Sequence, residues 1–185
     1  MDALIDKLNQ IKPISVPLKD FLLTNVRMFE FEAGEHLPYR PPASYMIYFV
    51  DYGSLAGVNN SENRRDPVIL YTKDDFIIPS LHNGCKEYFG QLVFMSPVKL
   101  FGIDVRTACG TLSVFPEALD LMFGLIQNQI QKGYQRETFL RLSPRERFSF
   151  LFTHKPSLFL ESTSAHLAAY LNISKRQLFR YKNSK

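Results

Sequence analysis

The sequence lacks a long apolar run, and no stretch approaches the roughly 18–20 residues that a helix needs to span a bilayer. Its first ten residues, MDALIDKLNQ, do not have the basic and then apolar layout of a secretory signal. Cysteine is scarce, since the chain has only Cys85 and Cys109, which cannot build a four-thiolate zinc or iron–sulfur site. We therefore expect a soluble, cytoplasmic protein without a membrane partner, whose thiols are free and buried rather than joined in a disulfide.

The signatures of enzymes are absent as well. The histidines stand apart at positions 36, 82, 154 and 166, and no His-x-His pair follows the Gly34-Glu35 turn, as a metal-dependent cupin would require. The sequence contains no Gly-x-Ser-x-Gly elbow, phosphate-binding loop or Cys-His signature. These absences predict a protein that is not an enzyme and that holds no metal and no cofactor.

Charge is distributed unevenly along the chain. The net charge is +4, but residues 1–139 contain 13 Lys and Arg against 16 Asp and Glu, whereas residues 140–185 contain 9 against 2. The basic surplus thus belongs to the C-terminal quarter, which suggests a polyanionic partner for that part alone. A basic tail that merely stays solvated is the alternative at this point.

The first two thirds of the chain indicate mostly β-structure. A helix is expected at residues 2–11, where the apolar residues share one face and Pro13 follows. From residue 14 to about residue 111, short apolar or alternating segments are separated by turn residues. The 16 Phe and 9 Tyr of the chain suit a β-rich interior. We therefore predict an α+β protein in which residues 1–112 form a β-sandwich or barrel.

A helical period replaces the strands over residues 113–139. Apolar residues recur at spacings of four, three and four, as in a coiled coil, and two more widen the stripe on one flank. The stripe consists of Phe115, Leu119, Met122 and Ile126, widened by Phe123 and Ile130. Periodicity alone leaves two interpretations open. The stripe packs against its own domain, or it pairs with the same helix of a second subunit.

The last segment, residues 140–185, predicts a group of short helices. The sequence SPRE at residues 143–146 supplies an N-cap serine, a proline at the first helical position and a glutamate three residues after the cap. A helix over 164–171 is followed by Asn172, which tolerates the left-handed backbone of a helix end, and by Ser174, which can cap a second helix. Two short helices joined in this way form a helix-turn-helix.

The second of these helices is the expected DNA-reading element. In this motif the second helix lies in the major groove, where its outward side chains reach base edges and its flanks reach phosphates. The predicted DNA-binding residues are Lys175, Arg176, Gln177 and Arg180 for the bases, with Ser174 and Lys182 toward the phosphates. Residues 174–185 contain five Lys or Arg and no acid, which favours DNA binding over a helical hairpin with a merely basic surface.

The order of these parts resembles the Crp/Fnr family of bacterial transcription regulators. AHLAAYLNISKRQLFRYK is similar to the family's helix-turn-helix, and RLSPRERFSFLFTHKPSLF to the segment before it, whereas FEFEAGEHL and YFVDYGSLAGV resemble the barrel strands more weakly. The resemblance implies a cyclic-nucleotide-binding-like double-stranded β-helix or jelly-roll barrel as the sensor domain at residues 1–112. It also implies a dimerisation helix at 113–139, a DNA-binding domain at 140–185, and a homodimer that binds a palindromic operator in double-stranded DNA.

The sensor departs from the family's nucleotide-binding pattern. The stretch KDDFIIPSLHNGCKEYFG stands where nucleotide-binding members hold the cyclic phosphate. There Ile77 and Ile78 replace the Gly-Glu that follows the family's Phe, here Phe76. No arginine lies between Arg65 and Arg106, so a phosphate would lack its best partner. We expect an effector other than cyclic AMP, and the identity or existence of a small molecule in the barrel stays open.

Three further departures bear on function. A haem ligand at His82 or Cys85 is conceivable within the family, but an inert histidine is the preferred interpretation. The chain ends at Lys185, so the wing that follows the reading helix in many members is not expected, and Asn172 stands where glycine is usual. We predict a sequence-specific regulator. The alternative is a degenerate family member that dimerises or binds a protein without reading a specific sequence.

Overall fold

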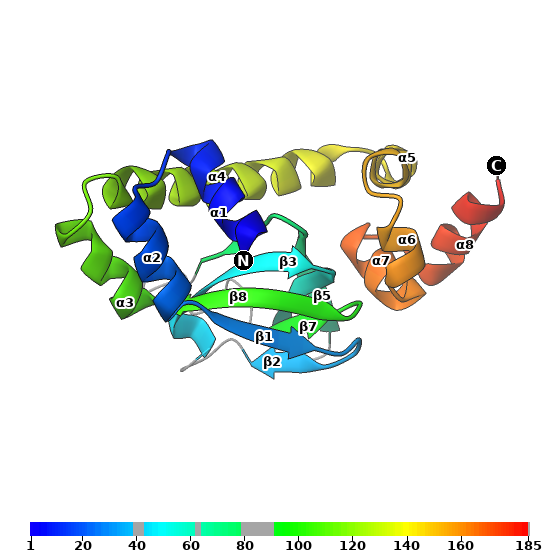
Figure 1. The fold of residues 1–185 in the computed structure, drawn as a ribbon. Helices are drawn as coiled ribbons and strands as arrows, with labels where there is room; N and C mark the ends of the chain where they lie inside the picture. The colour runs from blue at the N-terminus through cyan, green and yellow to red at the C-terminus, as the bar shows by residue number, and fades with distance from the viewer. Residues whose placement is uncertain (39–42, 62–63, 79–90, 185) are drawn as a thin grey trace.

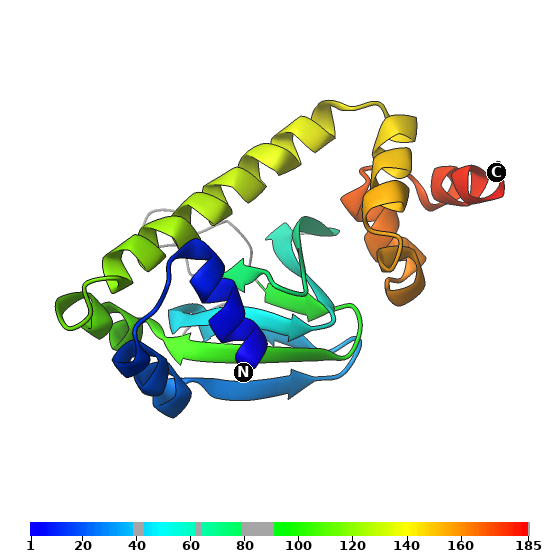
Figure 2. The same ribbon diagram turned by 45° about the horizontal axis from the view of Figure 1, so that its top comes forward.

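The computed structural model of the chain describes residues 1–38, 43–61, 64–78 and 91–184. Two β-sheets lie beside a long helix, and a group of shorter helices follows at the far end of that helix (Figures 1 and 2). The strands are β1 (Arg27–Phe31), β2 (His36–Pro38), β3 (Met46–Tyr52), β4 (Ser54–Ser61), β5 (Arg64–Thr72), β6 (Phe76–Ile77), β7 (Gln91–Phe94) and β8 (Val98–Asp104). The helices are α1 (Asp2–Ile11), α2 (Val16–Asn25), α3 (Val105–Gly110), α4 (Ala118–Arg141), α5 (Pro144–His154), α6 (Leu158–Glu161), α7 (Ser164–Tyr170) and α8 (Lys175–Asn183).

The strands form two four-stranded antiparallel sheets, in the orders β1-β8-β3-β6 and β2-β7-β4-β5. The expected double-stranded β-helix or jelly-roll barrel is therefore not closed within the described residues, because hydrogen-bonded ladders run inside each sheet and none joins the two. The sheets pack face to face as a sandwich, which interdigitating side chains hold together. Its interior contains Tyr48, Val50, Leu55, Ile69, Tyr71, Ile77, Leu92, Phe94, Val98 and Leu100.

The outer face of the first sheet is buried as well. In β3 four consecutive residues, Ile47 to Val50, are buried, because Tyr48 and Val50 face the sandwich interior while Ile47 and Phe49 face helices. Helices α1, α2 and α4 cover this face (Figure 1). The cover is made by Leu4, Leu8, Leu18, Leu121 and Leu125 against Phe49, Phe76 and Phe101. Strands that are buried on both faces read as apolar runs rather than as an alternating pattern.

The expectation of strands throughout residues 14–111 is wrong at both ends, where α2 and α3 lie. Helix α2 begins after Ser15, whose hydroxyl accepts a hydrogen bond from the Leu18 N–H, and it has Pro17 in its first turn. Helix α3 begins after Asp104, whose carboxylate accepts from the N–H of Arg106 at 2.8 Å. Both helices therefore start at residues that favour N-caps. The sequence interpretation missed this local signal because the flanking residues have a strand-like pattern. The helix predicted at residues 2–11 is confirmed as α1.

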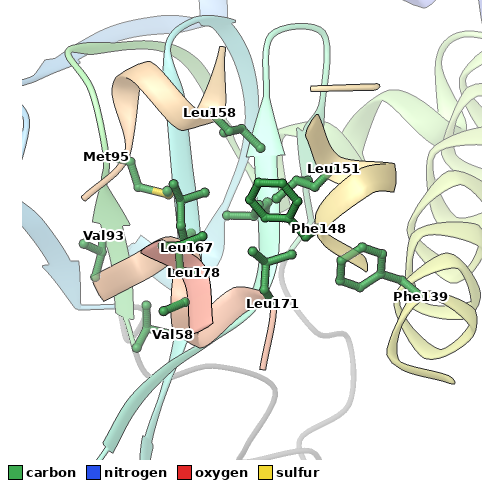
Figure 3. Packing of buried hydrophobic residues seen from close by; sticks show 13 residues of the cluster. Val58, Val93, Met95, Phe139, Phe148, Leu151, Leu158, Leu167, Leu171 and Leu178 are labelled. Atoms are coloured by element: carbon green, nitrogen blue, oxygen red, sulfur yellow. The ribbon is translucent and has the colours of Figure 1, made fainter. Parts of the chain in front are cut away.

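The outer face of the second sheet carries helices α5–α8, which we call the head. The head and this sheet share one continuous apolar core, in which side chains of both converge (Figure 3). The sheet contributes Ala56, Val58, Leu70, Val93 and Met95, and the helices contribute Phe139, Phe148, Leu151, Leu158, Leu167, Ala168, Leu171 and Leu178. Helix α7 lies closest to the sheet, against β5. The C-terminal basic segment is thus fixed on the sandwich rather than tethered to it.

A substitution inside the shared core should destabilise the head and the second sheet together. Leu167, which is 0% exposed, contacts this core from α7, so Leu167→Ala should lower the free energy of unfolding by about 2–5 kcal/mol. Hydrogen exchange should show the same loss of protection in β5 and in α7. Leu160→Ala is the control, since Leu160 is 90% exposed and its replacement should cost about 0.5 kcal/mol or less. Loss of protection confined to α7 would contradict a shared core.

Candidate nucleic-acid interface

The segment predicted as a helix-turn-helix contains two helices, α7 and α8, joined by a short turn. Asn172 in the connection has φ 51°, the left-handed conformation expected of a helix end. The turn is closed by backbone hydrogen bonds, in which the Asn172 N–H donates to the Ala169 carbonyl at 3.0 Å and the Ile173 N–H to the Ala168 carbonyl at 2.9 Å. The Ile173 side chain is half-buried against the core of the head. The turn therefore forms without the usual glycine.

Helix α8 begins with a complete capping box. The Ser174 hydroxyl accepts from the Gln177 N–H at 3.1 Å, and the Gln177 side-chain carbonyl accepts from the Ser174 N–H at 3.0 Å. Both side chains are therefore engaged at the helix start, although the sequence suggested that Gln177 faces a base and Ser174 a phosphate. Leu178, which is fully buried, and Tyr181, whose ring centroid lies 5.5 Å from that of Phe148, hold the inner side of the helix.

The outward side of α8 is basic. Lys175, Arg176 and Arg180 are exposed, and Figure 1 shows α8 on the side of the head away from the sheets. Lys182 is half-buried, with its ammonium 5.6 Å from the centre of the Phe159 ring. Of the six predicted DNA-binding residues, three thus form the exposed basic face, two form the cap and one lies on the flank.

A buried arginine on α5 holds the turn of the helix-turn-helix in place. Arg147 is 6% exposed, and its guanidinium donates to the carbonyls of Leu140 and Leu142, both at 2.9 Å, and to that of Asn172 at 3.3 Å. One side chain thereby connects the end of α4 to the turn before α8. Helix α5 has the expected cap, and the hydrogen bonds at Ser143 hold the pKa of the Glu146 carboxyl below its usual range.

The second half of α4 contacts both the sandwich and the head. The Lys132 ammonium lies 2.5 Å from the Asp75 carboxylate in the β5–β6 turn. The Arg136 guanidinium lies 4.0 Å from the centre of the Tyr170 ring in α7, and burial lowers the pKa of Arg136. A cation above an aromatic face, away from water, is a stabilising contact. Helix α4 is therefore attached to the turn that precedes residues 79–90 and to the first helix of the reading motif.

The structure divides the predicted apolar stripe between two sides of α4. Phe115 precedes the helix and packs on Phe21, with ring centroids 5.7 Å apart, and Met122 packs against the first sheet. The remaining stripe faces away from the chain's own core. It consists of Leu119, Phe123 and Ile130, which are exposed, and Ile126, which is half-buried. Tyr134, four residues after Ile130, is exposed and extends the stripe. The same spacing rule that selected Ile130 would have found Tyr134.

This combination of a two-sheet sandwich, a long helix and a terminal helix-turn-helix matches solved structures. FixK2 from Bradyrhizobium japonicum is 13% identical, with a TM-score of 0.69 over 85% of this chain and 82% of that one. A protein described as a Crp/Fnr family transcriptional regulator, from Eubacterium rectale, is 11% identical, with a TM-score of 0.65 over 91% of this chain and 82% of that one. The chain has the fold of the Crp/Fnr regulators.

The likeness extends to nucleotide-binding proteins of the same fold. A cyclic nucleotide-binding domain containing protein from Listeria monocytogenes is 16% identical, with a TM-score of 0.66 over 97% of this chain and 88% of that one. No family model and no curated protein matches the sequence. The similarity therefore lies in the arrangement of the elements, which the order of sequence patterns also indicated.

Within the Crp/Fnr fold, much of the stretch expected to replace the phosphate-binding cassette lies outside the described residues, together with His82 and Cys85. The part that is described, Phe76 and Ile77 in β6, is buried: Phe76 packs on Phe49 with ring centroids 5.1 Å apart, and Ile77 faces the sandwich interior. An apolar cavity of about 80 Å³, lined in part by Phe49 and Phe76, lies between the outer face of the first sheet and helices α1, α2 and α4.

In the described ranges no cluster of three His, Cys, Asp or Glu side chains could hold a metal ion. Among the helices that the structure describes, none is long and apolar enough to cross a membrane. Cys109 is a free thiol, as expected, but it is exposed rather than buried. Its place near the end of the short helix α3 explains the exposure, because only Ala108 of that helix is buried.

Removing the guanidinium of Arg147 should loosen the reading motif. Arg147→Ala leaves three carbonyls without their donor, so we expect the free energy of unfolding to fall by about 2–4 kcal/mol in urea titration. Arg145→Ala is the matched control, since Arg145 is exposed on the same helix and its loss should cost about 0.5 kcal/mol or less. Equal effects of the two substitutions would show that Arg147 does not hold the turn.

Proposed function

We propose that this chain is a sequence-specific DNA-binding transcription regulator of the Crp/Fnr type. The observation that carries the proposal is the exposed face of Lys175, Arg176 and Arg180 on a capped helix, at the outer side of a helix-turn-helix. In this motif the N-terminal residues of the second helix contact base edges in the major groove. Arginine forms two hydrogen bonds to guanine there, and lysine contacts guanine or phosphate.

The electrostatic pattern supports DNA as the partner. Residues 140–185 carry nine Lys or Arg against two acids, and the two acids, Glu146 and Glu161, lie outside α8. In the described segment 174–184, exposed cations therefore have no acidic neighbour in the sequence. A basic surface of this kind attracts the phosphate backbone over a distance of about 10 Å at moderate ionic strength.

The exposed stripe of α4 supports a dimer. Leu119, Phe123, Ile130 and Tyr134 are each about half or more exposed, on a helix whose opposite side is already buried. With the half-buried Ile126, the run from Leu119 to Ile130 has spacings of four, three and four, which are typical of the seam of paired helices. We propose that two copies pair through this stripe, so that two copies of α8 face the two halves of a palindromic operator.

The proposed effector is not cyclic AMP. No arginine lies between Arg65 and Arg106, so the guanidinium that would form paired hydrogen bonds with a phosphate is missing from this stretch. In the described part of β6, Ile77 points to the sandwich interior and Phe76 packs among apolar residues on the outer face of the first sheet. We leave a small molecule in the sandwich unassigned.

The alternative function is a family member that dimerises without specific reading. The engagement of Gln177 in the cap favours it, because this leaves fewer side chains free to contact bases. In that case the basic face of α8 would bind DNA only through phosphates, and its affinity would fall steeply with salt for every sequence alike.

Substitutions on α8 should separate specific from general binding. After selection of an operator from random duplexes, Arg176→Ala and Arg180→Ala should each lose about 1–3 kcal/mol per lost base contact at fixed salt, measured by fluorescence anisotropy. Arg145→Ala is the control, because it removes an exposed arginine outside the reading helix. The proposal is wrong if the selection enriches no sequence, or if neither α8 substitution changes the operator affinity. The alternative, a protein that dimerises without reading a specific sequence, would then remain.

A charge in the stripe of α4 should yield monomers. Ile130→Glu and Phe123→Glu each place a carboxylate where the proposed seam is apolar, so sedimentation at micromolar concentration should show a monomer of 21.4 kDa. Gln135→Glu adds the same charge at an exposed position of α4 away from the stripe and should leave the dimer intact. A dimer that survives both changes would assign the interface to another surface.

A further inference from the structure

Helix α8 carries a large apolar side chain in the middle of its basic face. Phe179 is 51% exposed. It follows Arg176 by three residues and precedes Asn183 by four, so these side chains are neighbours on the same helical face. Arg180 adjoins it in the sequence. All four side chains are exposed, and Phe179 is the member of the group that cannot form a hydrogen bond through its side chain.

The fold does not require this phenyl ring. The other aromatic rings of the head interlock, with centroids 5.2–6.0 Å apart among Phe148, Phe152, Phe159 and Tyr181. Within the described part of the head, neither a ring contact nor a cation–ring contact involves Phe179. Phenylalanine is also a modest helix former, so an exposed position on α8 would be served better by alanine or lysine. The described part of the fold therefore does not account for a phenyl ring at this position.

Single exposed apolar side chains are common on protein surfaces, so exposure alone does not indicate a role. The location of Phe179 is what matters, because the proposed reading surface faces the major groove of DNA. The apolar feature that base pairs offer in that groove is the C5-methyl group of thymine, with which a phenyl ring makes a favourable contact. Cytosine and the purines have no methyl group at that position.

We propose that Phe179 is a specificity-determining residue that contacts a thymine methyl group in each half-site. This inference rests on the proposed function, since it requires α8 to lie in the major groove. The arginines on either side would fix the register by their hydrogen bonds, and the ring would then select a T·A pair beside the bases that they contact. Cytosine methylated at C5 should be accepted at the same position, because it presents the same group.

Deoxyuridine, which lacks only the methyl group of thymine, is the direct probe. We expect the operator selected by the wild-type protein to contain thymine in each half-site. Replacing that thymine by deoxyuridine should weaken binding about fourfold per half-site, and about fifteenfold when both half-sites are replaced. The affinities are compared by fluorescence anisotropy at one salt concentration.

Variants of the ring should change this ratio in a defined way. Phe179→Ala should bind the thymine and deoxyuridine operators equally, whereas Phe179→Leu, which keeps an apolar side chain, should retain most of the preference. Arg180→Ala is the matched control, since it should weaken binding to both operators and leave their ratio unchanged. Both Phe179 variants remove an exposed side chain, so their thermal unfolding should match the wild type within a few degrees.

The outcomes separate this inference from the function on which it rests. A selection that enriches no sequence overturns both. A selected operator that lacks thymine, or one whose affinity is the same with deoxyuridine at every thymine, overturns the role of Phe179 and leaves the proposed function standing. A deoxyuridine effect that persists in Phe179→Ala overturns it as well, because the methyl group would then contact another side chain.

Discussion

The apolar contact between the head and the outer face of the second sheet is the interaction on which the rest of the structure depends. Ala56, Val58 and Leu70 of the sheet have no polar atoms in their side chains, and they would face water if the head were elsewhere. Helix α7 covers them, and α7 in turn positions α8 through the turn at Asn172. The direction in which the basic face points is therefore decided by packing on the sheet.

Helix α4 takes part in two different kinds of contact. Its inner side, with Leu121 and Leu125, covers the first sheet, and its outer side is left with a stripe of exposed apolar residues. Near its end, Lys132 and Arg136 join the β5–β6 turn and Tyr170 of the head. A shift of the β5–β6 turn would displace α7 as well, because Lys132 contacts the turn and Arg136, on the same helix, contacts Tyr170 of α7. Helix α4 therefore connects the β5–β6 turn of the sandwich to the helix-turn-helix.

Much of the C-terminal architecture could be predicted because its signals are local. The capping residues Ser143 and Ser174, the left-handed Asn172 and the buried Leu178 each follow from chemistry within a few residues. The order of sandwich, helix and reading motif followed from changes in period.

What could not be predicted depends on contacts between distant segments. Phe115 packs on Phe21 and Met122 packs against the first sheet, so both face the chain's own core. The heptad pattern alone does not distinguish these residues from the exposed ones of the same stripe. Gln177 is an exception, because its cap is local: Ser174 and Gln177 have the same capping-box spacing as Ser143 and Glu146, although the sequence interpretation assigned Gln177 to a base. Arg147 donates hydrogen bonds to three carbonyls, those of Leu140, Leu142 and Asn172. The sequence does not show that these carbonyls come together around one side chain. Phe179 was not predicted as a site residue, because an apolar residue in a basic helix is usually assigned to the core. Its 51% exposure is evident only in the structure.

The shared core also limits how such a protein can be altered or can diverge. A head transplanted onto another sandwich would need a matching outer sheet face, because Leu158, Leu167 and Leu178 meet side chains from both parts. The outward residues of α8 can therefore be exchanged more readily than the side chains beneath them. The shared core, by contrast, changes only when residues of the second sheet and residues of the head, which lie far apart in the sequence, change together.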